Sequence, residues 1–133
     1  MKLKPRRILV VEDDQSVAKM LGMALRSAGF EVEHVSSGGA ALLALDTGTH
    51  TAVLLDLGLP DRRAGDVVRR LTSLTRVPKP FWLVLSAMDF SDAEKTYSIS
   101  RERFIRKPYD PWDVVKRIDR EISDGSGRKN GAK

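Results

Sequence analysis

The chain alternates short apolar runs with longer amphipathic segments. Residues 8–11 and 52–55 are continuously apolar, which is typical of strands buried on both faces. Other runs are shorter or alternate with polar residues, as at residues 31–35. The pattern predicts five strands, at residues 8–11, 31–35, 52–55, 81–85 and 104–105.

Apolar residues at helical spacing fill the segments between these strands. They run from Val17 to Ala28, where Gly29 is a natural helix stop, and reappear in a helix that opens at Ser37. A third helix, carrying Val67, Val68, Leu71 and Leu74, is expected after a loop that holds Pro60 and Gly65. Residues 89–100 favour a helix capped by Ser91, although its apolar stripe is thin.

The last predicted helix begins with Asp110 as its cap and Pro111 just inside. Its apolar face consists of Trp112, Val115, Ile118 and Ile122. We expect one domain over residues 1–123, followed by a flexible basic tail over residues 124–133. Strands that alternate with helices predict an α/β fold, a doubly wound parallel sheet with helices on both faces.

In such a sheet, ligands bind beyond the carboxyl ends of the strands. Residues with reactive or charged side chains are concentrated at those ends. The first strand is followed by three acids, the third by one acid, the fourth by a hydroxyl and the fifth by an ammonium group: Glu12, Asp13, Asp14, Asp56, Ser86 and Lys107.

Clustered carboxylates repel one another unless a cation or a proton intervenes. The chain has no cysteine and only two histidines, so oxygen ligands for Mg²⁺ or Mn²⁺ are favoured over a zinc site. An aspartate can attack phosphorus itself and hold an acyl phosphate. A metal ion, a lysine and a hydroxyl placed around the transferred group would stabilise its charge.

The composition and charge of the chain argue against a membrane or a nucleic acid as its partner. The content is 41% apolar and 31% charged, as in ordinary globular proteins, and no apolar run is long enough to cross a membrane, so we expect a cytoplasmic protein. The net charge is +5, but seven basic residues lie in segments 1–7 and 128–133. The interior then holds 16 basic residues against all 18 acidic ones, so we expect no nucleic acid to bind this chain alone.

Five short motifs together resemble the response-regulator receiver domains of two-component signal transduction. They are the segments 8–14, 37–42, 56–60, 86–87 and 107–108, in this order along the chain. The resemblance covers roughly residues 6–122. It implies a flavodoxin-like sheet with the strand order 2-1-3-4-5.

The resemblance also implies roles around a metal ion. Asp56 would be the phosphoacceptor and a metal ligand. Asp13 would bind Mg²⁺ or Mn²⁺ directly, Glu12 would act through a water molecule, and Gly58 would offer its backbone carbonyl. Asp14 falls outside this set and is expected to cap the first helix.

Further residues would bind and read out the phosphoryl group. Ser86 and Lys107 would contact its oxygens, and the Lys107–Pro108 bond would be cis. Ser86 would then move toward the phosphoryl group and Phe104 would turn inward, which reshapes the face of the fourth helix, fifth strand and fifth helix. The expected donor is a histidine kinase or a phosphotransfer protein, and the reshaped face is a possible homodimer contact.

Three departures from the family pattern stand out. Gly65 lies five residues after Pro60 instead of four, so the loop is one residue longer, and its Arg62 and Arg63 are expected to face solvent rather than the phosphoryl group. A Gly-Ala pair is missing before the fifth strand, which predicts a short or irregular fourth helix. The switch aromatic Phe104 lacks a tyrosine hydroxyl.

Other functions fit less well. A phosphohydrolase of the haloacid-dehalogenase type needs a second aspartate two residues after the nucleophile, where Gly58 stands. A receiver-like interaction module that is not phosphorylated remains as the alternative. Trp82 and Trp112 each lie in an apolar periodic segment and are expected to be packing residues rather than base-stacking platforms. His34 and His50 are expected to lie on the surface and are given no role.

Overall fold

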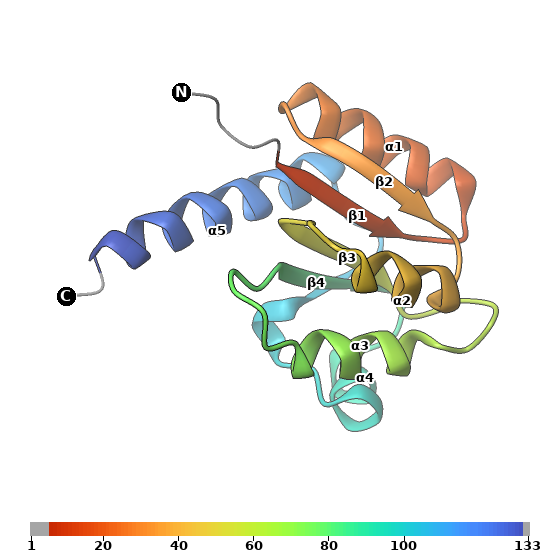
Figure 1. The fold of residues 1–133 in the computed structure, drawn as a ribbon. Helices are drawn as coiled ribbons and strands as arrows, with labels where there is room; N and C mark the ends of the chain where they lie inside the picture. The colour runs from red at the N-terminus through yellow and green to blue at the C-terminus, as the bar shows by residue number, and fades with distance from the viewer. Residues whose placement is uncertain (1–5, 132–133) are drawn as a thin grey trace.

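The structure is a computed structural model that describes residues 6–131. Its centre is a five-stranded parallel sheet with the order β2-β1-β3-β4-β5, as the resemblance implied (Figure 1). Each strand lies within a residue or two of its predicted position. The strands are β1 Arg7–Val11, β2 Glu31–Val35, β3 Ala52–Asp56, β4 Phe81–Ser86 and β5 Phe104–Arg106.

Helices cover both faces of the sheet. They are α1 Gln15–Ser27, α2 Gly38–Asp46, α3 Ala64–Ser73, α4 Phe90–Tyr97 and α5 Pro111–Gly131, with a short 3₁₀ helix, η1, at Arg101–Arg103. Helices α1 and α5 lie on one face, and α2, α3 and α4 lie on the other (Figure 1). No helix within residues 6–131 is long and apolar enough to cross a bilayer.

Alternating side chains of β1 divide the interior into two apolar clusters. Ile8 and Val10 pack with residues of α1 and α5, whereas Leu9 and Val11 pack with residues of α2 and α3. All four are almost completely buried. A strand buried on both faces must be apolar throughout, which is why its sequence shows no alternation.

Parallel pairing brings the carboxyl ends of the strands to one edge. Val11 pairs with Leu55, and Asp56 pairs with Leu85 one position further along. Ser86 pairs with Arg106, the residue before Lys107. The register therefore collects the polar residues that follow β1, β3, β4 and β5.

Polar side chains fix the starts of the helices. The Asp14 carboxylate accepts hydrogen bonds from the backbone nitrogens of Ser16 and Val17, at 2.9 and 3.1 Å, so its predicted capping role is confirmed. Asp110 accepts one from the nitrogen of Trp112 at 2.9 Å, also as predicted. Gly29, which follows α1, has a φ of 94° that suits glycine.

Two helix boundaries differ from the predictions. Gly65 lies in the first turn of α3 rather than in the loop before it. Helix α4 begins one residue after Asp89, whose carbonyl accepts hydrogen bonds from the nitrogens of Asp92 and Ala93, so Ser91 is inside the helix and is not its cap. Helix α4 is short, as expected, and Ser98 ends it in the left-handed conformation.

Two side chains, those of Trp112 and His50, are buried differently from the expectation. Trp82 is buried, but Trp112 is 49% exposed, because Val114 rather than Trp112 belongs to the inward face of α5. His50 is buried, not on the surface, and its Nε2 lies 2.8 Å from Oε1 of Glu33. Helix α5 continues to Gly131, into the segment that the sequence assigns to a tail.

The short strand β5 is tied to β4 through an arginine. The guanidinium carbon of Arg103 lies 4.4 Å from the centre of the Trp82 ring, and Nη1 of Arg103 donates a hydrogen bond of 3.0 Å to the Trp82 carbonyl. Arg103 immediately precedes Phe104, the first residue of β5. The beginning of β5 is thus anchored at the edge of the sheet remote from the acidic residues.

Candidate functional site

Three carboxylates meet at the edge formed by the strand ends. One oxygen from each of Glu12, Asp13 and Asp56 lies within 4.8 Å of the others. Glu12 and Asp56 are only 2% and 7% exposed, whereas Asp13 is open to solvent. Like charges this close are unfavourable without a compensating cation.

Lys107 supplies part of that compensation. Its Nζ lies 3.2 Å from Oε1 of Glu12 and 3.4 Å from Oδ1 of Asp56. Its backbone nitrogen donates a 2.8 Å hydrogen bond to the carbonyl of Ser86, which fixes the start of the chain segment after β5. The Lys107–Pro108 bond is cis, as the resemblance implied. The ammonium group therefore lies between the two buried carboxylates.

The pKa directions reflect this crowding. Burial, and secondly the charge of Asp56, raise the pKa of Glu12 above its ordinary value. For Lys107, burial opposes the charged form, but Asp56 and Glu12 outweigh it, so its pKa is also raised. One ammonium group among three carboxylates leaves an excess of negative charge, which favours a further cation at this edge.

The side chains present fit a hard divalent cation. Glu12 accepts a hydrogen bond from the nitrogen of Asp14 at 3.2 Å, and Asp56 accepts one from the nitrogen of Gly58 at 3.2 Å. Among the described residues, Asp13 alone of the three has no hydrogen bond or ion pair, so its oxygens are available to a metal ion. Few carboxylates and exposure to water are what Mg²⁺ prefers.

Ser86 and Phe104 lie next to this group of charges. Ser86 is 4% exposed, and its Oγ accepts a 3.1 Å hydrogen bond from the nitrogen of Met88, so the hydroxyl proton remains available for donation. Phe104 is half-buried and meets the ring of Phe90, the first residue of α4, edge to face at 5.5 Å between centroids.

Asp61 fixes the lengthened loop, a role that the sequence did not suggest. Its carboxylate accepts hydrogen bonds from the nitrogens of Gly38 and Gly39, at 3.1 and 2.9 Å, at the start of α2. Arg62 takes up a φ of 57°, and both Arg62 and Arg63 are exposed, as predicted. The segment after Asp56 is therefore held against α2.

Removing this carboxylate should produce a pH-dependent loss of stability. The nitrogen of Gly39, more than any other group, lowers the pKa of Asp61 below its ordinary 3.8. Its contribution is therefore present above about pH 4 and lost as the pH falls through the lowered value. We expect Asp61→Ala to unfold more easily at pH 7 in urea titrations, by at most about 1 kcal/mol because the carboxylate is exposed and solvent screens it, and the difference to close as the pH falls through the lowered pKa. A difference that is constant with pH would contradict this account.

His34 also contributes from a position to which the sequence gave no role. It is exposed, as expected, and its Nε2 lies 2.7 Å from the backbone carbonyl oxygen of Glu12. Residue 12 thus has its carbonyl held by β2 and its carboxylate held by Lys107. No local pattern marks this contact, because it joins neighbouring strands.

Comparison with known proteins agrees with this geometry. Residues 8–119 match the response regulator receiver domain family, so the chain belongs to that family. It is 34% identical over 130 residues to the sensory transduction protein RegX3 of Mycobacterium bovis, covering 89% of this chain and 56% of the relative. It is 35% identical over 113 residues to the DNA-binding response regulator MtrA of Mycobacterium leprae, covering 85% and 49%.

Solved structures show the same fold. A CheY-like receiver domain protein from Methanospirillum hungatei superposes with a TM-score of 0.81 at 21% identity, covering 94% of this chain and 99% of its own. A putative response regulator from Chloroflexus aurantiacus has a TM-score of 0.74 at 27% identity, covering 90% and 99%. The chain thus spans a whole receiver domain but about half the length of these curated relatives.

Proposed function

We propose that this receiver domain accepts a phosphoryl group on the Asp56 carboxylate, with Mg²⁺ or Mn²⁺ bound beside it. The supporting observation is that Asp56 has Lys107 Nζ 3.4 Å from its Oδ1 and also has a carboxylate oxygen within 4.8 Å of oxygens of Glu12 and Asp13. A nucleophilic carboxylate, a fixed ammonium group and carboxylates suited to a hard cation are what phosphoryl transfer to aspartate requires.

The metal ion would be held by Asp13, Asp56 and the Gly58 carbonyl, with Glu12 acting through water. When bound, it would neutralise charge on the phosphoryl oxygens. An Asp56 oxygen forms the new bond to phosphorus while the bond from phosphorus to the donor's atom breaks and the donor keeps the electron pair. Lys107 and the Ser86 hydroxyl then donate hydrogen bonds to the transferred oxygens.

The donor is proposed to be a histidine kinase or a phosphotransfer protein in the cytoplasm. The chain's own catalysis would be limited to taking up and later losing this group, so it is a signalling acceptor rather than an enzyme for other substrates. MtrA is named as DNA-binding, but this chain spans only 49% of it, and no nucleic acid is proposed for this chain alone.

Readout would run through the face of α4, β5 and α5. A phosphoryl group adds about −1.5 to −2 charge and strong acceptors, which draws Ser86 toward it. Phe104 would turn inward, away from Phe90, and change the support of α4. The changed face is the proposed site for a downstream partner or a second copy.

Acetyl phosphate with Mg²⁺ tests the proposal directly. Intact-mass spectrometry should show one added phosphoryl group on the wild-type chain. Asp56→Asn should show none, whereas Asp46→Asn, an acid on α2 that pairs with Arg70, should behave as wild type. An adduct that persists in Asp56→Asn would refute Asp56 as the acceptor, and no adduct on the wild type would favour the unphosphorylated interaction module.

A further inference from the structure

Hydrogen bonds hold the turn that joins β1 to α1 on both sides of Asp13. The nitrogen of Glu12 donates a 3.0 Å hydrogen bond to the carbonyl of Val35. The nitrogen of Asp14 donates one of 3.2 Å to the Glu12 carboxylate, and the carbonyl of Asp14 accepts one of 3.0 Å from the nitrogen of Ala18. The Asp13 carboxylate itself has no partner within the described part of the chain. Its place therefore depends on the backbone around it.

A side chain from the neighbouring strand β2 also contacts this turn. Nε2 of His34 lies 2.7 Å from the carbonyl oxygen of Glu12, which belongs to the peptide that joins Glu12 to Asp13. A carbonyl oxygen only accepts, so Nε2 must carry the hydrogen. The backbone of His34 is paired with Val10 in the sheet. The ring thus ties the peptide before Asp13 to the regular part of the sheet.

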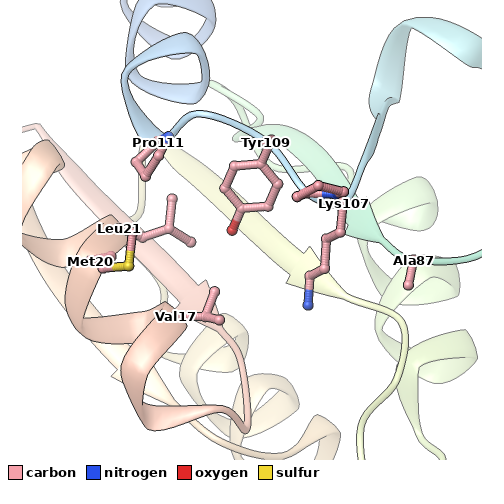
Figure 2. Close-up of a pocket in the computed structure, with 8 residues that line it drawn as sticks. Val17, Met20, Leu21, Ala87, Lys107, Tyr109 and Pro111 are labelled. Carbon is pink, nitrogen blue, oxygen red and sulfur yellow. The ribbon is translucent and has the colours of Figure 1, made fainter.

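The carboxylate of Glu12 is held by a different group, which it shares with the proposed phosphoacceptor. Nζ of Lys107 lies 3.2 Å from Oε1 of Glu12 and 3.4 Å from Oδ1 of Asp56. Figure 2 shows the Lys107 side chain extended, with this nitrogen at the end of β3. The His34 contact involves only the main chain of residue 12 and does not involve Asp56. It can therefore keep the turn in place while Lys107 serves the phosphoryl group.

We propose that His34 is a positioning residue for the metal site. Its Nε2–H holds the peptide between Glu12 and Asp13, and so keeps the Asp13 carboxylate where the ion binds. This inference rests on the proposed role of Asp13 as a direct metal ligand. Groups that orient the ligands of a metal ion commonly contribute about 10- to 100-fold to its affinity. Because His34 is exposed and water competes for the carbonyl, we expect a smaller contribution here.

Three substitutions of His34 separate the hydrogen bond from the ring and from any charge on it. His34→Leu should weaken Mg²⁺ binding by about 3- to 10-fold in isothermal titration, which matches one net hydrogen bond. His34→Gln should restore most of the affinity, because its uncharged amide N–H reaches nearly as far from Cα as Nε2 does. His34→Asn holds the same amide closer to the backbone and should bind as weakly as His34→Leu. Wild-type affinity in His34→Leu, no recovery in His34→Gln, or equal recovery in His34→Asn would overturn the proposal.

The adjacent residue of β2 provides a control for general loosening of the strand. Glu33 contacts Arg7, the first residue of β1, at 3.4 Å and His50 at 2.8 Å, away from the acidic edge. Glu33→Ala should lower the free energy of unfolding in urea but leave the Mg²⁺ affinity as in the wild type. If Glu33→Ala weakened Mg²⁺ binding as much as His34→Leu, the effect would come from β2 as a whole and the positioning role would be refuted.

An NMR measurement without metal tests the contact by itself. The nitrogen chemical shift of the Asp13 amide responds to hydrogen bonding at the preceding carbonyl, which is that of Glu12. We expect this signal to move in metal-free His34→Leu and to return toward its wild-type position in His34→Gln. An unchanged signal in His34→Leu would overturn the contact. A wild-type chain that bound no Mg²⁺ would refute the proposed metal site, and the Asp13 signal would still decide whether His34 holds the peptide.

Discussion

Replacing Asp13 by alanine should weaken Mg²⁺ binding by about 100-fold or more and abolish phosphoryl uptake from acetyl phosphate at millimolar Mg²⁺. Glu12 and Asp56 already share the Lys107 ammonium group, whereas Asp13 faces solvent and has no partner among the described residues. It is therefore the carboxylate best placed to bind the ion directly. Isothermal titration with Mg²⁺ and intact-mass measurement give the two readouts.

The neighbouring acid provides a matched control. Asp14→Ala removes the cap of α1 and should lower the free energy of unfolding by about 1 kcal/mol without changing Mg²⁺ affinity. Asp13→Ala should instead lower the Mg²⁺ affinity. It should leave the metal-free protein slightly more stable, because one of three repelling carboxylates is gone. Equal Mg²⁺ affinity in Asp13→Ala and the wild type would refute the proposed ligand.

Gly38→Ala is expected to give the largest loss of stability, about 2–3 kcal/mol. A Cβ atom on Gly38 would lie 2.6 Å from the Cβ of Arg63 and 2.9 Å from its backbone carbonyl carbon. Neither atom belongs to a flexible side-chain end, so the loop after Asp56 would have to move away from α2. Urea unfolding measures the loss.

Gly39→Ala separates this clash from a general effect of alanine in α2. Its Cβ would meet no atom closer than 3.5 Å, so the variant should stay within about 0.5 kcal/mol of wild type. Because the displaced loop contains Gly58, Gly38→Ala should also weaken Mg²⁺ binding. Similar stabilities for the two variants would show that α2 and the loop are not tightly packed.

The sheet and the acidic edge were predictable because they depend on local patterns. The residues of β1 and β3 must be apolar on both faces, so each strand is marked by its own sequence, and parallel pairing then aligns the residues that follow. The order of the strands came from the resemblance, since periodicity does not determine which strands pair. The site roles of Asp56, Asp13 and Lys107 remain predictions until tested chemically.

What the sequence missed depends on contacts between distant segments. Asp61 bonds to α2 across 22 and 23 residues, and His50 is buried against Glu33 across 17. Nothing near either residue in the chain indicates these partners. Trp112 was misplaced for another reason: near a helix start the apolar stripe is ambiguous, and the smaller Val114 occupies the inward position.

Side-chain contacts hold strand β5 at both of its ends. Arg103 fastens its beginning to Trp82, and just beyond its end Lys107 is fastened to Glu12 and Asp56. A three-residue strand held at both ends has little freedom to shift its register along β4. If Lys107 moves to a phosphoryl group on Asp56, as proposed, we expect Phe104 to rotate or α4 to move, because β5 itself has little freedom to shift.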